Sequence, residues 1–101
     1  FAMRGVRAPS AAVPPAPTAP SAALTTTGVQ VYWQGATGAA TYSVERAGAA
    51  KGPWKTICTR CVTDRDDGFT DPNGSRGNWY RVVPFNVAQK RGAPSRSVQA
   101  A

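Results

Sequence analysis

The sequence predicts an all-β domain in which two sheets pack face to face. Short segments alternate apolar and polar residues with a period of two, as half-buried strands do. Clusters of Gly, Pro, Asn and Asp separate these segments at short spacing, which is typical of hairpin turns. No segment repeats its apolar residues at the 3.6-residue period of an amphipathic helix. Many short strands with regular turns favour a β-sandwich.

The clearest strand covers residues 29–34, where Val29, Val31 and Trp33 share one face and three polar or amphipathic residues share the other. Residues 41–46, 54–57, 69–71, 78–86 and 95–100 follow as further strands, and dense turn signals such as DPNGSRG separate them. The expected core collects the inward positions: Leu24, Val29, Val31, Trp33, Tyr42, Val44, Ile57, Phe69, Tyr80, Val82 and Val98.

Composition predicts how the chain is divided. Residues 8–23 are almost all Ala, Pro and Ser, a composition that forms semi-rigid, extended linkers. No apolar run approaches the roughly 20 residues of a membrane span, and the first residues carry no signal-peptide pattern. We expect residues 1–7 to be the tail of a preceding domain, 8–20 to be a linker and 21–101 to be the sandwich.

The net charge of +7 comes from 12 basic and five acidic residues. The basic residues are scattered, with no run and no helical stripe, and no nucleic-acid-binding signature is present. We therefore expect a solvated, arginine-rich surface and no nucleic-acid partner. Weak attraction to anions or acidic polymers stays open.

The only two cysteines, Cys58 and Cys61, stand in the stretch ICTRCVTD. A thioredoxin-like Cys-x-x-Cys opens a helix in an α/β fold, whereas this pair follows a predicted strand. Zinc normally takes four Cys or His ligands, and the chain has no His and no third Cys. A local disulfide or two free thiols remain. We expect the disulfide, as a staple of the connection between residues 54–57 and 69–71, and hence an oxidising compartment.

Several short motifs follow one another in a specific order: PTAPSAAL, VQVYWQGA with Trp33, ATYSVERA with Tyr42, GPWKTI, FTD, YRVVPFN and GAPS. Over residues 17 to about 100 this order resembles a fibronectin type III domain. The resemblance implies a seven-stranded, immunoglobulin-like sandwich with sheets A-B-E and G-F-C-C′, in which the Tyr80 hydroxyl anchors the E–F corner. The cysteine pair departs from the family pattern. So does Pro84, where we expect a bulge or a missing hydrogen bond.

We expect no catalytic site, no metal and no cofactor. Without His there is no ready general base near neutral pH. The single glutamate, Glu45, is expected to point outward and to pair with Arg81 on the adjacent strand. The four aspartates within residues 64–71 lack the spacing of a calcium loop, so we expect a solvated turn there.

The outer face of residues 78–86 is the candidate interaction surface. If Tyr80 and Val82 point inward, the alternate residues point outward, and three of those are apolar. Such a stripe is more than a lone monomer usually exposes. It can dock a neighbouring domain, stack sugar rings, or lie under the stems of Arg and Glu side chains. The candidate residues of this stripe are Trp79, Arg81, Val83 and Phe85. Trp54, which follows a Gly-Pro turn, is added to them because we expect it to lie near the stripe or over the edge of the sandwich.

Fibronectin type III-like modules are common in secreted bacterial enzymes that degrade polysaccharides, and GPWKTICTRCVTD is similar to modules of mannanase- or cellulase-type glycoside hydrolases. The resemblance implies a monomeric, non-catalytic spacer, docking or stabilising module of a secreted, extracellular enzyme that acts on plant-type polysaccharide. Its partners would be the neighbouring catalytic domain and polysaccharide, with no membrane contact. Two alternatives stay open: a carbohydrate-binding module that uses Trp54, Trp79 and Phe85, and a protein–protein adhesion domain of a surface protein.

Overall fold

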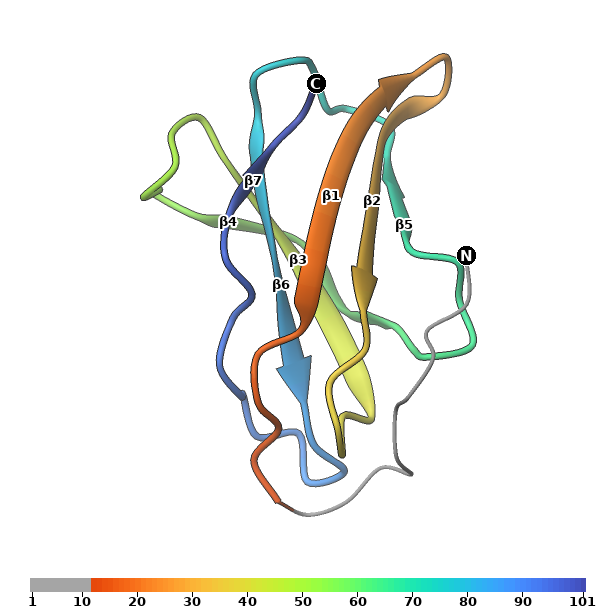
Figure 1. The fold of residues 1–101 in the computed structure, drawn as a ribbon, viewed down its shortest axis with the longest axis vertical. Helices are drawn as coiled ribbons and strands as arrows, with labels where there is room; N and C mark the ends of the chain where they lie inside the picture. The colour runs from red at the N-terminus through yellow and green to blue at the C-terminus, as the bar shows by residue number, and fades with distance from the viewer. Residues whose placement is uncertain (1–11) are drawn as a thin grey trace.

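Residues 12–101, the part of the chain that the computed structural model describes, form seven strands in two facing sheets (Figure 1). One sheet has the order β1-β2-β5 and the other β4-β3-β6-β7, with every paired strand antiparallel. The strands are β1 (Thr18–Thr25), β2 (Gly28–Gln34), β3 (Thr41–Ala47), β4 (Lys55–Val62), β5 (Phe69–Asp71), β6 (Trp79–Phe85) and β7 (Val98–Gln99). This order confirms the predicted seven-stranded, immunoglobulin-like sandwich with sheets A-B-E and G-F-C-C′.

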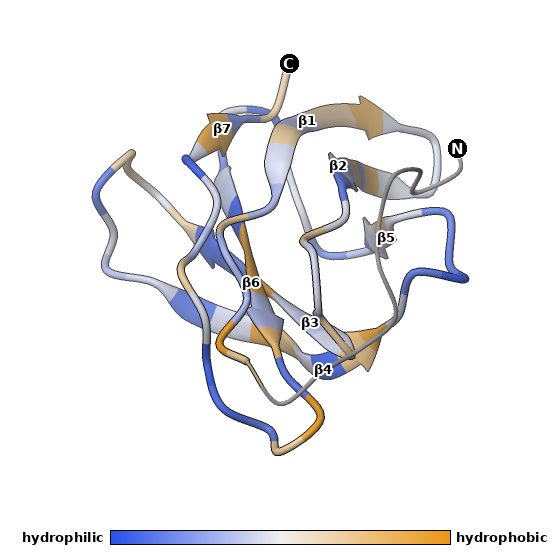
Figure 2. Ribbon diagram, turned by 60° about the horizontal axis from the view of Figure 1, so that its bottom comes forward, coloured by the Kyte–Doolittle hydropathy of each residue, from blue (hydrophilic) through white to orange (hydrophobic). Residues whose placement is uncertain are grey.

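The core lies between the two sheets because each strand turns alternate side chains inward. Trp33 of β2 and Tyr42 of β3 are fully buried, as predicted, and their ring centroids lie 5.6 Å apart. Tyr80 and Val82 of β6 are fully buried on the same side. In Figure 2 strongly hydrophilic stretches lie in the loops around the two layers and also alternate with apolar stretches along the strands. The period-two pattern thus predicts which face of each strand packs inward.

Leu24 is the one predicted core residue that is clearly exposed, at 41%. It pairs with Val29 and lies in phase with Ala22, so its side is the inner one. However, it stands near the end of β1, an edge strand of its sheet. The alternation of inward and outward positions therefore overestimates burial for a residue at the end of a strand. The partly buried Ile57, Phe69 and Val98 pack against the core.

The N-terminal part of the sandwich includes residues that were expected to form the linker. β1 begins at Thr18, and Pro14 and Pro17 are already buried. A Cβ at Gly92 would collide with the Pro14 carbonyl oxygen, so the two backbones are in close contact. Proline suits such an edge position because it needs no hydrogen-bond partner for its nitrogen. The expected tail, residues 1–7, lies outside the described residues.

The last residues of the chain connect the two sheets. β7 pairs with the start of β6, and Ala101 then exchanges backbone hydrogen bonds with β1: its N–H donates to Ala22 O at 3.2 Å, and its carbonyl accepts from Leu24 N at 3.0 Å. The end of the chain therefore closes one side of the sandwich.

Pro84 sits in β6 without shifting the register of the β3–β6 pair, in which it lies opposite Tyr42. Its carbonyl accepts from Gly92 N at 2.8 Å, so its nitrogen faces the segment that leads into β7. The regular β6–β7 ladder is limited to Trp79 and Tyr80. Pro84 therefore lacks its N–H on the side where β6 and β7 are no longer regularly paired. The expected bulge is absent from the β3–β6 ladder.

Candidate functional site on the outer face of the larger sheet

The predicted Cys58–Cys61 disulfide is confirmed, with the two Cα atoms 5.6 Å apart. Both cysteines lie inside β4, whereas the sequence placed them in the connection after it. Val44 pairs with Cys58 and Tyr42 pairs with Val62, so two steps along β3 correspond to four along β4. Such a mismatch is a β-bulge, and the disulfide closes it.

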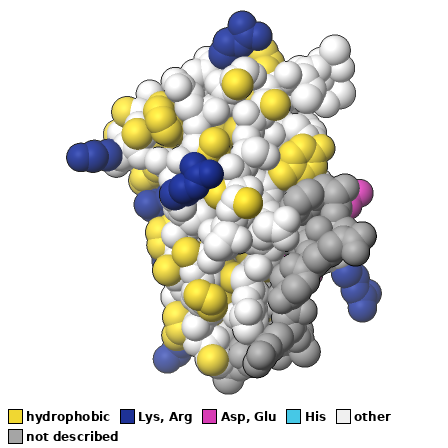
Figure 3. Space-filling view, viewed as in Figure 1, with side chains coloured by type: hydrophobic (Ala, Val, Ile, Leu, Met, Phe, Trp, Pro, Cys, Tyr) yellow, Lys and Arg dark blue, Asp and Glu magenta, His cyan; other side chains and the backbone are white. Residues whose placement is uncertain are grey.

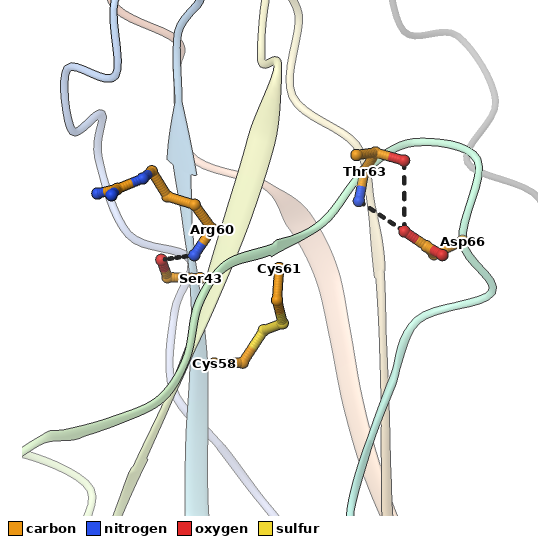
Figure 4. Close-up of a disulfide and its surroundings, with 6 residues drawn as sticks. All are labelled: Ser43, Cys58, Arg60, Cys61, Thr63 and Asp66. Atoms are coloured by element: carbon orange, nitrogen blue, oxygen red, sulfur yellow. Dashed lines mark hydrogen bonds between the residues drawn. A yellow bond between two sulfur atoms is a disulfide. The ribbon is translucent and has the colours of Figure 1, made fainter.

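Arg60 occupies this bulge in the left-handed region, with a φ of 47°, which residues other than Gly rarely adopt. Its backbone N–H donates to Ser43 Oγ at 2.7 Å. Figure 4 shows its side chain leaving β4 on the side away from the sulfur atoms. The guanidinium carbon lies 5.5 Å from the centroid of the Phe85 ring. The CTRC bulge therefore directs an arginine onto the outer face of β6.

Glu45 of β3 accepts hydrogen bonds from two arginines on the same face. Arg81 lies directly opposite it, as predicted, and donates through Nε to Oε1 at 2.5 Å. Arg91 donates through Nη1 to Oε2 at 3.2 Å, a contact that the sequence pattern does not predict. Burial acts to raise the pKa of Glu45, but the hydrogen bonds from Arg91 and Arg81 outweigh it, so the pKa lies below its ordinary value. Glu45 is thus a buried, ionised link between two arginines.

Trp54 belongs to this face as well. The Arg81 guanidinium carbon lies 4.6 Å from the centroid of a Trp54 ring, within the range of a cation–π contact. Trp79 lies two residues before Arg81 on β6, opposite Ala47, and is half-buried. The two tryptophans and the central arginine of the candidate set therefore share one side of the sheet.

The predicted exposure of Val83 and Phe85 is wrong, because Val83 is 0% and Phe85 9% exposed. Both occupy outward positions of β6, but arginine side chains extend over this strand from elsewhere in the chain. Long basic side chains cover apolar surface with their stems while their heads stay in water. Three interpretations of this stripe were open: docking of a domain, stacking of sugar rings, and coverage by the stems of Arg and Glu side chains. The observed burial of Val83 and Phe85 fits the third. We call the set Arg60, Arg81, Arg91, Glu45, Trp54 and Phe85 the arginine face.

Tyr80 reaches the E–F corner with its hydroxyl, which donates to Asp71 Oδ2 at 2.8 Å. Arg46 donates to the same oxygen at 2.7 Å, and the backbone N–H of Asn73 donates to Oδ1 at 3.2 Å. Burial, together with the bond to Asp71, raises the pKa of the Tyr80 hydroxyl, which therefore stays a donor. Asp71 is only 2% exposed, so the expectation of a solvated turn is wrong at this residue.

Asp64 is a second aspartate of that stretch with a structural contact. The Tyr42 hydroxyl accepts from Ala36 N at 2.9 Å and donates to Asp64 Oδ1 at 2.7 Å. Burial raises the pKa of Asp64 more than the Tyr42 bond lowers it. These two aspartates thus hold buried tyrosines.

Within residues 12–101, no group of three or more His, Cys, Asp and Glu side chains is placed to hold a metal ion. The same part of the chain shows no pocket. None of its segments forms a helix that could cross a membrane.

No protein-family model and no curated protein sequence matches the chain. Among solved structures, it is similar to a Fn3-like protein from Clostridium thermocellum, with 26% identity and a TM-score of 0.76, over 89% of this chain and 94% of that one. The chain has a fibronectin type III-like fold. It is also similar to a β-1,2-glucanase from Parabacteroides distasonis, with 18% identity and a TM-score of 0.70. That match covers 94% of this chain but 13% of the glucanase chain, and at this identity it shows the fold alone.

Proposed function

We propose that this fibronectin type III-like domain is a non-catalytic accessory module of a secreted glycoside hydrolase, joined to it through residues 1–7 and an Ala/Pro/Ser-rich segment. The observation that carries the proposal is the glucanase match, in which a region with this fold makes up 13% of a much longer chain. Domains of this type serve as spacers or as docking and stabilising elements beside a catalytic domain.

The Cys58–Cys61 disulfide supports an extracellular location, because such bonds persist in oxidising compartments and are rare in the cytosol. It lies in an edge strand of the larger sheet, close to solvent at Cys61. A reducing compartment would put this bond at risk, whereas secretion preserves it.

Docking to a neighbouring domain does not depend on an apolar stripe, since Val83 and Phe85 are buried. Pro14 lies against Gly92, so the first described residues of the chain lie beside the loop between β6 and β7. A preceding domain would therefore approach this end of the molecule.

The coding sequence upstream of residue 1 tests the proposal first. We expect a glycoside hydrolase domain there, and deletion of residues 12–101 from that longer protein is expected to lower its melting temperature or its activity on insoluble substrate. An upstream surface-protein architecture without a catalytic domain would overturn the proposal in favour of an adhesion domain.

A second test separates the accessory role from the binding of neutral polysaccharides through the tryptophans. The chain is incubated with insoluble mannan, cellulose, chitin and xylan, alongside Trp54→Ala and Trp79→Ala. We expect no retention on these neutral polymers and no release of reducing sugar. Retention that either Trp substitution abolishes would instead make the chain a carbohydrate-binding module.

A further inference from the structure

The arginine face brings three arginines to one side of the larger sheet. On the side of the molecule that carries β1 in front, the Lys and Arg side chains stand apart from one another (Figure 3). On the outer face of β3 and β6, by contrast, Arg60, Arg81 and Arg91 are brought to one side by contacts with Phe85 and Glu45. We propose that this face binds an acidic polysaccharide, with the carboxylates of a polyuronate as the groups that the arginines recognise.

Charge supports an anionic ligand. Three guanidinium groups and one carboxylate leave the face with a net charge of +2, and the carboxylate of Glu45 is itself buried at 5% exposure. Among the described residues, the ion pairs of this face involve Arg81 and Arg91 but not Arg60. Arg60 is exposed and lies over an aromatic ring, so its charge is available to a partner.

The three arginines are held in place before any ligand arrives. The disulfide-closed bulge and the Ser43 bond fix the backbone of Arg60, and its guanidinium lies over the Phe85 ring. Glu45 holds the guanidinium groups of Arg81 and Arg91 through hydrogen bonds. A guanidinium has five N–H donors, and the bonds to Glu45 use one on each of its two partners. Ordered arginines with spare donors bind carboxylates at a lower entropic cost than mobile side chains do.

The aromatic neighbours favour a sugar polymer over a small anion. Trp54 lies against Arg81, and Trp79 is half-buried on the same face. An indole offers an apolar surface to a sugar ring while the adjacent guanidinium meets its carboxylate. Phe85 lies four positions after Arg81 on β6, roughly 13 Å along a strand, so the face matches an extended ligand with several charges.

The first measurement compares polygalacturonate with fully methyl-esterified polygalacturonate, which keeps the sugar chain but removes the charge. Binding of the whole 101-residue chain is followed by calorimetry or affinity electrophoresis at low salt. We expect binding to the acid form that weakens as salt increases, and no measurable binding to the ester. Equal binding to both polymers, or binding to neither, overturns the proposal.

Matched arginine variants locate the site. Arg60→Gln is expected to weaken polygalacturonate binding about tenfold, the loss of one charge-assisted contact. Arg76→Gln, in the exposed turn between β5 and β6, removes the same charge and is expected to change affinity less than about twofold. Equal losses in the two variants would mean diffuse attraction to a basic protein and would overturn the assignment to this face.

The bulge offers an independent check that does not remove a charge. Replacing both Cys58 and Cys61 by Ser should release Arg60 and weaken binding by about as much as Arg60→Gln, with no further loss when the three changes are combined. An additive loss would contradict the role given to the bulge. Poly-glutamate is tested in parallel, and tighter binding to it than to polygalacturonate would assign the face to an acidic protein segment instead.

Discussion

The hydroxyl of Tyr80 in β6 donates a hydrogen bond of 2.8 Å to Oδ2 of Asp71, which ends β5 in the opposite sheet. Arg46 of β3 donates to the same oxygen at 2.7 Å. The Asp71 carboxylate therefore ties two strands of one sheet to the last strand of the other. Hydrogen bonds to a buried charged group are among the stronger polar contributions to stability, and each partner lost leaves the charge less compensated.

Tyr80→Phe is expected to lower the free energy of unfolding by about 1–3 kcal/mol, because it removes a donor from a buried carboxylate. Urea denaturation of the variant and the wild type measures the difference. A double-mutant cycle with Asp71→Asn should give a coupling of about 0.5 kcal/mol or more. Additive effects of the two substitutions would mean that the bond contributes no stability of its own.

Gly74→Ala is expected to destabilise the domain by about 1–3 kcal/mol through overpacking. A Cβ at Gly74 would collide with the Tyr80 hydroxyl and lie 2.7 Å from Cγ2 of Val29. Gly48→Ala is the matched control, since a Cβ there meets nothing within 4 Å. Thermal unfolding of both variants gives the comparison, and equal melting temperatures would contradict the close packing at this corner.

Removal of the disulfide by Cys58→Ala and Cys61→Ala together is expected to cost about 2 kcal/mol, the loop-closure contribution of a very small ring. The fold should persist, because Cys58 is the only one of the two cysteines that belongs to the described hydrophobic core. Urea denaturation under oxidising conditions measures the loss. Reduction of the wild-type protein should reproduce it, and a variant as stable as the oxidised wild type would exclude a stapling role.

The buried faces of the strands were predictable because alternation is a local property. Trp33 and Tyr42 lie in runs of strict period two, and both are fully buried. The Glu45–Arg81 pair was predictable for a related reason, since both point outward on strands expected to be neighbours. In each case the relevant information lies within a few residues of the chain or follows from the strand order.

The cover over the outer face was not predictable in this way. Val83 is buried although its phase points it outward. On the same face, Arg60 of β4 lies over the Phe85 ring and Arg91, from beyond β6, reaches Glu45. The first of these depends on a bulge that no alternation pattern records, and the second on the path of an irregular segment. The burial of Asp71 likewise involves contacts with Arg46 and Tyr80, two residues of the opposite sheet.

Stability should depend on pH through Glu45. Burial raises the pKa of this carboxyl, but its bonds to Arg91 and Arg81 lower it more, so the pKa in the folded state lies below the ordinary value. The folded protein therefore releases this proton more readily than the unfolded chain does, and ionisation stabilises the fold. That stabilisation is fully present above the unfolded-state pKa of about 4.3 and is lost as the pH falls through the lower, folded-state pKa.

Glu45→Gln should remove this contribution. At pH 7 the variant is expected to be less stable than the wild type by about 1–3 kcal/mol, because two arginines lose their charged partner. The difference should shrink as the pH is lowered below about 4, where the wild-type carboxyl also becomes neutral. Urea denaturation of both proteins from pH 7 down to pH 2 measures it. A difference that stays constant over this range would mean that Glu45 acts through packing and not through its charge.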